Sequence, residues 1–275
     1  MLRLLSGLFI AAMLFSAGVS AQEDFPGRKL FEDVAYMTVE QFGQEYESAH
    51  IVDVRSPYEY DTIHIKGAVN IPLSSHNFSN QVAALRGTSD RPIVFYCNGH
   101  TCLKSYKAVR QAQVFGVEGV YAFDAGVFDW AKAFPQRTVL LGTSPINPAS
   151  LISGDQFKSR LLEPAEFDRR VQSGEYFVID ARSREQRAAT GLFPFVEQRG
   201  SLDDEKQLNG HIRTAMSEGK PLLIYDQVGK QVRWLEYRLQ AMGVKDYYFL
   251  KGGADGFFEA LPISGKFADA SADAK

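Results

Sequence analysis

The chain has 275 residues, of which 45% are hydrophobic and 23% charged, values typical of a globular protein. This length suffices for one large domain or two ordinary ones. The net charge of -3 at pH 7 gives no sign of a nucleic-acid partner, because such proteins concentrate positive charge. The only two cysteines, Cys97 and Cys102, are too few for a disulfide framework.

The first 21 residues are typical of an export signal. Arg3 precedes an apolar run at 4–15, which is short for a membrane span, and Val19 and Ala21 are the small residues expected before a cleavage site. Gln22 stands where a lipid-anchored protein would have cysteine. We therefore expect cleavage after residue 21 and a periplasmic or secreted protein that no longer contacts the membrane; an uncleaved anchor is the alternative.

The next part of the chain predicts strands that alternate with helices. Short runs rich in β-branched and aromatic residues predict strands. Apolar residues at helical spacing that end at Gly116 predict a helix, and a second helix closes the unit. The expected strands lie at 50–54, 68–73, 92–97 and 120–124, and the expected helices at 102–116 and 127–134. Such alternation favours a mostly parallel sheet with helices on both faces.

The same order returns in the second half of the chain. Strands are expected at 176–181, 221–226 and 247–250, and a helix at 231–243. Asp53 and Arg55 correspond to Asp180 and Arg182, an offset of 127 residues. The segments 116–135 and 243–262 match at the same offset, with glycine, valine, tyrosine, alanine and proline at identical places. Two distant blocks that share one offset indicate two copies of one domain.

The repeat and the composition divide the chain. The segment between the copies clusters Pro, Gly, Ser and Asn, which is a linker composition, and the C-terminal end is small and polar. We expect an export signal at 1–21, a first domain at 28–140, a linker at 141–157, a second domain at 158–265 and a disordered tail at 266–275.

The two copies differ at the end of their central strand. "IVFYC" ends at Cys97, whereas "LLIYD" ends at Asp226. Nineteen residues separate Cys97 from Gly116, but 17 separate Asp226 from Gly243, so the first copy has two more residues here. A loop from a parallel strand to a helix is where open α/β sheets bind ligands, and its amides favour anions. A cysteine there should be more acidic than usual, and its thiolate is a nucleophile.

These segments resemble the rhodanese-like family of sulfurtransferases. "DVRSPYEYDTIHIKGAVNIP" is similar to the family's first fingerprint, and "FYCNGHTCLKSYKA" to its strand, cysteine loop and helix. The loop is longer than the usual six residues, and Cys102 stands where the family often has arginine, as in a subgroup with a second cysteine before "KS". In the second copy the likeness is weaker, and Asp226 replaces the nucleophile. The resemblance implies two tandem α/β rhodanese-like domains, the first active and the second inactive.

The resemblance also implies a reaction. Cys97 would take sulfur from thiosulfate or a similar small donor as a persulfide and pass it to a thiol or to cyanide. No metal or organic cofactor is implied. The loop residues would bind the substrate anion: Asn98, Gly99, His100, Thr101, Cys102, Leu103 and Lys104. The physiological donor and acceptor and the oligomeric state stay open.

Individual side chains keep alternative interpretations. Cys102 is a resolving thiol, a disulfide partner of Cys97 or a neutral neighbour. His100 is expected to be a solvated loop residue more than a tuning group, and His64 to be structural. Because Asp53 and Arg55 recur as Asp180 and Arg182 beside a missing nucleophile, we expect them to hold loops together.

The cysteine loop is also compared with the requirements of other kinds of site. Zinc is disfavoured because two cysteines and His100 supply fewer than four ligands. A cysteine phosphatase needs an arginine where this loop has Leu103. The open alternatives are a periplasmic thiol–disulfide or sulfur-carrier protein that uses Cys97 and Cys102, and a non-catalytic binding module.

Overall fold

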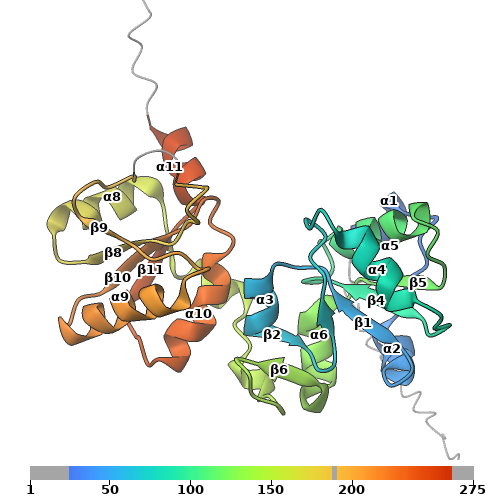
Figure 1. Ribbon diagram of the computed structural model, residues 1–275. Coiled ribbons are helices and arrows are strands. Elements are labelled where there is room, and N and C mark those ends of the chain that lie inside the picture. Colours follow the sequence, from blue (N-terminus) through green and yellow to red (C-terminus); the bar gives the residue numbers. More distant parts are fainter. Residues whose placement is uncertain (1–24, 188–190, 262–275) are drawn as a thin grey trace, which may run out of the picture.

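The computed structural model describes residues 25–187 and 191–261, and it shows two α/β lobes side by side (Figure 1). Each lobe has a parallel sheet with helices on both faces, which confirms the predicted fold class. The expected signal at 1–21 and the expected tail at 266–275 lie outside the described residues.

The sheet of the first lobe has the order β3-β1-β4-β5, and all its pairings are parallel. All four residues of the central strand β4 are buried, as its apolar sequence predicts. A separate antiparallel pair joins β2 to β6. The strands are β1 (His50–Asp53), β2 (Ile63–Ile65), β3 (Val69–Asn70), β4 (Ile93–Tyr96), β5 (Val120–Phe123) and β6 (Thr138–Leu140).

Neighbouring residues of β4 point to opposite faces of this sheet. Phe95 packs with α4 and α5 on one face, where α1 lies against Tyr106 of α5, and Tyr96 packs with α2 and α6 on the other. A sixth helix, α3, follows β1 and leads into β2. The helices are α1 (Pro26–Leu30), α2 (Val39–Glu45), α3 (Pro57–Thr62), α4 (Phe78–Arg86), α5 (Lys104–Val114) and α6 (Gly126–Ala133).

The second lobe has the strand order β7-β11-β10-β8-β9, again parallel throughout. Helices α9 and α10 cover one face, and α8 and α11 cover the other. The strands are β7 (Leu161–Leu162), β8 (Phe177–Asp180), β9 (Glu197–Arg199), β10 (Leu222–Tyr225) and β11 (Tyr247–Leu250). The helices are α8 (Pro164–Ser173), α9 (Glu205–Ser217), α10 (Val232–Ala241) and α11 (Gly253–Ala260).

The two lobes share one hydrophobic cluster, which runs from Trp130 in the first to Trp234 in the second. Helix α3 contacts α10 across the junction (Figure 1). The segment expected as a linker, 141–157, contains the 3-10 turn η2 (Pro148–Ser150) and leads into α7 (Gly154–Lys158). It buries Ile152, whose amide donates to the Tyr237 hydroxyl at 3.0 Å. This packing sets the two lobes against each other.

Two elements are shorter than the sequence predicts. The strand expected at 68–73 is reduced to β3, because Asn70 bonds its side chain to the carbonyls of Asp53 and Arg55 and because Pro72 has no N–H to donate. The helix expected from Cys102 begins at Lys104, because the Cys102 amide instead closes a turn with the Gly99 carbonyl at 2.7 Å.

Candidate active site in the cleft between the lobes

Cys97 comes directly after β4, at the carboxyl edge of the first sheet. Its side chain is fully buried, and its carbonyl accepts a hydrogen bond from the Val127 amide at 3.0 Å. This bond ties the loop after β4 to the start of α6. The connection between β5 and α6 therefore holds the backbone of Cys97 in place.

Cys97 and Cys102 are joined as a disulfide, with their Cα atoms 6.5 Å apart. This separation lies within the usual range for disulfides. The Cys97 sulfur also lies 3.3 Å from the Cys102 carbonyl oxygen and 3.9 Å from the Ser105 hydroxyl oxygen. Of the two sulfur-bearing residues, Cys102 is partly exposed and Cys97 is not. The loop thus presents Cys102 on its outer side and keeps Cys97 beneath it.

The loop forms one wall of a cleft of about 620 Å³ between the two lobes. The opposite wall comes from the loop after β10 and from the first turn of α10. The residues of the Cys97 loop that line the cleft are Asn98, Gly99, His100, Thr101, Cys102 and Lys104. The residues from the second lobe are Gly229, Lys230, Gln231, Arg233 and Trp234.

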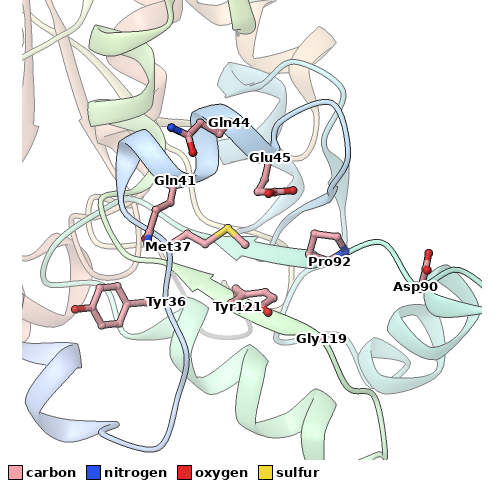
Figure 2. A pocket seen from close by; sticks show the side chains of 9 residues that line it. All are labelled: Tyr36, Met37, Gln41, Gln44, Glu45, Asp90, Pro92, Gly119 and Tyr121. Carbon is pink, nitrogen blue, oxygen red and sulfur yellow. The ribbon is translucent and has the colours of Figure 1, made fainter.

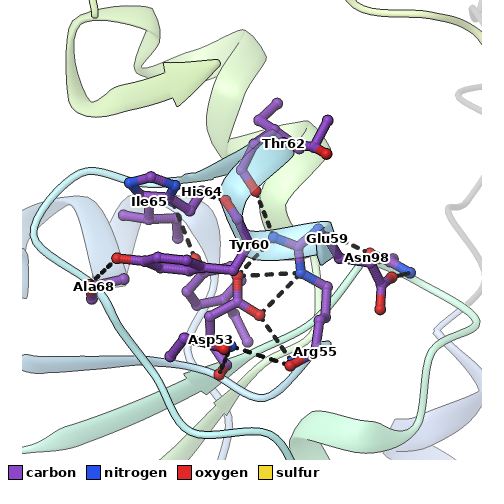
Figure 3. A network of polar contacts seen from close by, with 12 residues as sticks. Asp53, Arg55, Glu59, Tyr60, Thr62, His64, Ile65, Ala68 and Asn98 are labelled. Atoms are coloured by element: carbon purple, nitrogen blue, oxygen red, sulfur yellow. Dashed lines mark hydrogen bonds and ion pairs between the residues drawn. The ribbon is translucent and has the colours of Figure 1, made fainter. Parts of the chain in front are cut away.

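A buried polar network supports the first residues of the loop (Figure 3). Arg55 is fully buried, pairs with both carboxylate oxygens of Asp53 and donates to the Asn98 side-chain oxygen at 3.1 Å. Asn98 in turn donates to Glu59 at 3.1 Å. Burial acts against the charge of Arg55, but Asp53 outweighs it and the pKa of the guanidinium is raised. The network fixes Asn98 beside Cys97.

His100 is held on the cleft wall by its neighbours. Its Nε2 lies 2.5 Å from a carboxylate oxygen of Asp129 in α6, and its ring centroid lies 4.4 Å from that of Phe25. His100 thus keeps about 29% of its side chain exposed and is also bonded to Asp129, a contact that the sequence did not predict. Asp129 also accepts a hydrogen bond from Lys132, so its carboxylate is shared between His100 and Lys132 on the rim of the cleft.

The equivalent loop of the second lobe encloses a carboxylate. The two side-chain oxygens of Asp226 accept from the amides of Gly229, Gln231 and Val232, the last two at 2.6 and 3.1 Å. Burial raises the pKa of Asp226, and the hydrogen bonds from the amides lower it. Burial is the larger effect, so the pKa is raised overall. The Asp226 carbonyl accepts from the Ala254 amide at 2.9 Å, as the Cys97 carbonyl accepts from Val127. The loop after the central strand is thus an anion-binding loop, already filled in this lobe.

The sequence family described as "Rhodanese-like domain" matches residues 38–133 and 163–260, which coincide with the two lobes. The chain belongs to the rhodanese family. Its two rhodanese-like domains follow each other in tandem, as the repeat predicts.

Several relatives with named functions match only part of this rhodanese chain. The thiosulfate:glutathione sulfurtransferase of Saccharomyces cerevisiae is 26% identical over 37% of this chain and 76% of its own. A probable adenylyltransferase/sulfurtransferase of Mycobacterium tuberculosis is 35% identical over 33% of this chain and 22% of its own. An HTH-type transcriptional regulator of the same species is 42% identical, and the match spans 30% of this chain and about a third of the regulator.

Among solved structures, the thiosulfate sulfurtransferase of Pseudomonas aeruginosa is similar to this rhodanese over 82% of this chain and 42% of its own. The identity is 17% and the TM-score is 0.38.

The other loop residues of this rhodanese divide between cleft and core. Leu103 packs against the core of the first domain, and Lys104 is the first residue of α5 and faces the cleft. The Nδ1 of His64 donates to the Tyr60 carbonyl at 2.7 Å, and its ring stacks on the Tyr60 ring. Further along α5, Arg110 pairs with Asp33.

The cleft residues of the second domain were not predicted from the sequence. Lys230, Arg233 and Trp234 come from the copy without a nucleophile, so no motif points to them. The available signal was the repeat itself, because each of them lies in or next to the loop that corresponds to the Cys97 loop.

A second hollow of about 420 Å³ lies elsewhere on the first domain (Figure 2). It includes Pro92 and Gly119, which precede β4 and β5, and so it lies at the amino edge of the sheet. None of the predicted site residues lines it. Among the described residues, no group of three or more His, Cys, Asp or Glu side chains is arranged to hold a metal ion. No helix in 25–187 or 191–261 is long and apolar enough to cross a membrane.

Proposed function

We propose that this rhodanese is a sulfurtransferase in which Cys97 carries the sulfur. The Cys97 thiolate attacks the outer sulfur of thiosulfate or a similar donor. The sulfur–sulfur bond of the donor breaks, sulfite leaves with the electron pair, and Cys97 becomes a persulfide. An acceptor, cyanide or a thiolate, then attacks the outer persulfide sulfur and releases the Cys97 thiolate.

The observation that carries the proposal is the anion held by the equivalent loop of the second domain. There, three backbone amides donate to the Asp226 carboxylate. A persulfide anion on Cys97 would extend a negative charge from the same strand end into a loop of the same kind. Hydrogen bonds from backbone amides to an anion are strong and need no reorganisation during the reaction. Asp226 places a negative charge in its loop but cannot form a persulfide, because a carboxylate accepts no sulfane sulfur.

The first test follows the sulfur on the protein. The reduced protein is incubated with thiosulfate, its intact mass is recorded, and thiocyanate formation is measured after cyanide addition. We expect a gain of one sulfur atom that Cys97→Ser loses and Cys102→Ser keeps. If the reduced wild type formed no adduct and no thiocyanate, sulfur transfer would be rejected and a non-catalytic binding module would be favoured.

The pairing of Cys97 with Cys102 supports a second candidate, a thiol–disulfide or sulfur-carrier role. In this reaction an external thiolate opens the disulfide, and the loop alternates between dithiol and disulfide. The activity of one variant distinguishes the two candidate functions. Cys102→Ser retains a sulfurtransferase with a single working cysteine, whereas a thiol–disulfide protein loses its activity with either cysteine.

We also propose that the protein acts after export, in the periplasm or outside the cell. The proposal rests on the charged, apolar and small residues of the first 21 positions and on a site built around a disulfide. Mass spectrometry of the mature protein from a fractionated native host tests it. We expect a chain that begins at Gln22, and a full-length chain in the cytoplasmic fraction would reject it.

A further inference from the structure

The cleft has a positively charged wall that the sulfur chemistry of Cys97 does not require. Lys230 and Arg233 come from the second domain and Lys104 from the first. Within the described residues, none of these three side chains has an ion-pair partner within 4 Å. The Arg233 Nε is shielded from solvent and lacks a hydrogen-bond acceptor. A shielded guanidinium nitrogen without an acceptor is costly unless a ligand supplies one.

The acidic groups nearby are engaged elsewhere. Asp129 bonds His100 and Lys132, and Glu59 accepts from Ser56 and Asn98. On the helix of Arg233, Glu236 points its Oε1 at the Tyr247 hydroxyl in the sheet. The charge of Lys104 acts on Glu59 and that of Arg233 on Glu236, but neither carboxylate forms an ion pair within 4 Å with these cations. Lys230 and Arg233 are therefore available to an anion that enters from outside.

Aromatic side chains fix the position of Arg233. Its guanidinium lies 5.0 Å from the ring centroid of Phe128, a residue of the first domain. Phe128 stacks on Trp234 with ring centroids 5.7 Å apart and 14° between the planes. This contact crosses the domain boundary, and it places the charge of Arg233 against the domain that carries Cys97.

The size and walls of the cleft indicate an organic ligand. A volume of about 620 Å³ lies in the range of sites for organic molecules, well above the need of a small inorganic anion. Phe128, Phe157 and Trp234 supply apolar surface for the body of such a ligand. The cysteine that faces this space is Cys102, directly above Cys97.

We propose that the second domain selects the acceptor, and that the acceptor is an organic thiol that carries a carboxylate or sulfonate. Arg233 and Lys230 bind the anionic end, and the aromatic wall holds the carbon chain. The acceptor thiolate attacks the outer sulfur of the Cys97 persulfide, the sulfur–sulfur bond breaks, the acceptor leaves as a persulfide and Cys97 leaves as a thiolate. This inference rests on the proposed sulfur transfer.

Three thiols of the same length test it, with thiosulfate as the fixed donor: 2-mercaptoethanesulfonate, 2-mercaptoethanol and 2-mercaptoethylamine. For the wild type we expect the lowest KM with the sulfonate and the highest with the amine. In Arg233→Gln and Lys230→Gln, the KM for the sulfonate should rise about tenfold, since a charged hydrogen bond is lost. The KM for the neutral thiol should change less than about twofold. Lys220→Gln, which removes an exposed charge beside Glu218 on the same domain, is the matched control.

Cyanide separates the failure of this inference from the failure of sulfur transfer. If the wild type forms no thiocyanate, the proposed function fails. If the wild type forms thiocyanate, but the KM for the sulfonate is the same in Arg233→Gln as in the wild type, the acceptor assignment fails while sulfur transfer stands. A binding measurement needs no turnover: quenching of Trp fluorescence by the sulfonate in Cys97→Ser should weaken about tenfold when Arg233→Gln is added. Equal quenching in both proteins would overturn the assignment.

Discussion

Gly126 lies so close to Gly99 that a Cβ at position 126 would come within 2.5 Å of the Gly99 Cα. Its φ of +69° is also one that residues with a side chain rarely adopt. The second domain repeats the arrangement: Gly253 has a φ of +62°, and a Cβ there would lie 2.6 Å from the Asp226 carbonyl oxygen. In both domains this glycine lets the loop after the central strand rest on the next strand–helix turn.

Gly126→Ala should therefore displace the Cys97 loop, and Gly253→Ala the Asp226 loop. Each change should lower the free energy of unfolding by about 1 kcal/mol or more from the positive φ alone. Only Gly126→Ala should lower kcat for thiocyanate formation, by about tenfold to a hundredfold, because small displacements of reacting groups are costly. Urea unfolding and steady-state kinetics measure the two effects. Equal losses of kcat in both variants would contradict a specific role for the first loop.

Local sequence patterns predict much of this site, because its supports are close together in the chain. Cys97 directly follows an apolar strand, and Arg55 pairs with Asp53 two residues away. The repeat at one offset further predicts that Asp226 occupies the corresponding strand end. These relations depend on strand pattern and short separations, which a sequence shows directly.

The other side of the cleft depends on how the two domains pack, which no local pattern encodes. Arg233 reaches the first domain through its contact with Phe128, 105 residues earlier in the chain. His100 meets Asp129 only because α6 begins beside the Cys97 loop. Both relations follow from long-range burial, so the sequence suggested neither the pairing of His100 nor the cations of the second domain.

Asp226 should be needed for the stability of the second domain. Asp226→Ala leaves the amides of Gly229, Gln231 and Val232 without their acceptor in a buried loop. The expected loss is about 2–4 kcal/mol, since unsatisfied buried donors are costly. Urea unfolding followed by tyrosine and tryptophan fluorescence measures it. Asp246→Ala, at an exposed carboxylate of the same domain, should change the stability by less than about 0.5 kcal/mol. Similar losses in the two variants would show that the amides do not depend on the carboxylate.

The disulfide should make sulfur transfer depend on a reductant. While Cys97 is bonded to Cys102, it has no thiolate to attack thiosulfate. The oxidised wild type should be inactive and should recover with dithiothreitol, whereas Cys102→Ser should be active without it. Thiocyanate formation at a series of reductant concentrations measures this dependence. If Cys102→Ser needs as much reductant as the wild type, another oxidation inactivates the protein.

Glu59 should give the first domain an acid-sensitive step. Its side chain is buried and accepts from the Ser56 amide and hydroxyl and from Asn98, at 3.0–3.1 Å. Burial acts to raise its pKa, but the charges of Arg55 and Lys104 and these hydrogen bonds outweigh burial and lower it. Because the folded pKa is lower than the ordinary value of 4.5, the ionised side chain stabilises the fold above that pH. This stabilisation is lost as the pH falls through the folded pKa.

The change Glu59→Gln keeps the shape of the side chain and removes its titration. At pH 7 the variant should be less stable than the wild type, and the difference should shrink as the pH falls below about 4.5. Urea unfolding at pH values from 7 to 3 gives the two curves. Glu118→Gln, at an exposed position of the same domain, is the matched control and should follow the wild-type curve. If the curves of Glu59→Gln and the wild type ran parallel down to pH 3, the Glu59 charge would contribute nothing to the stability of the loop support.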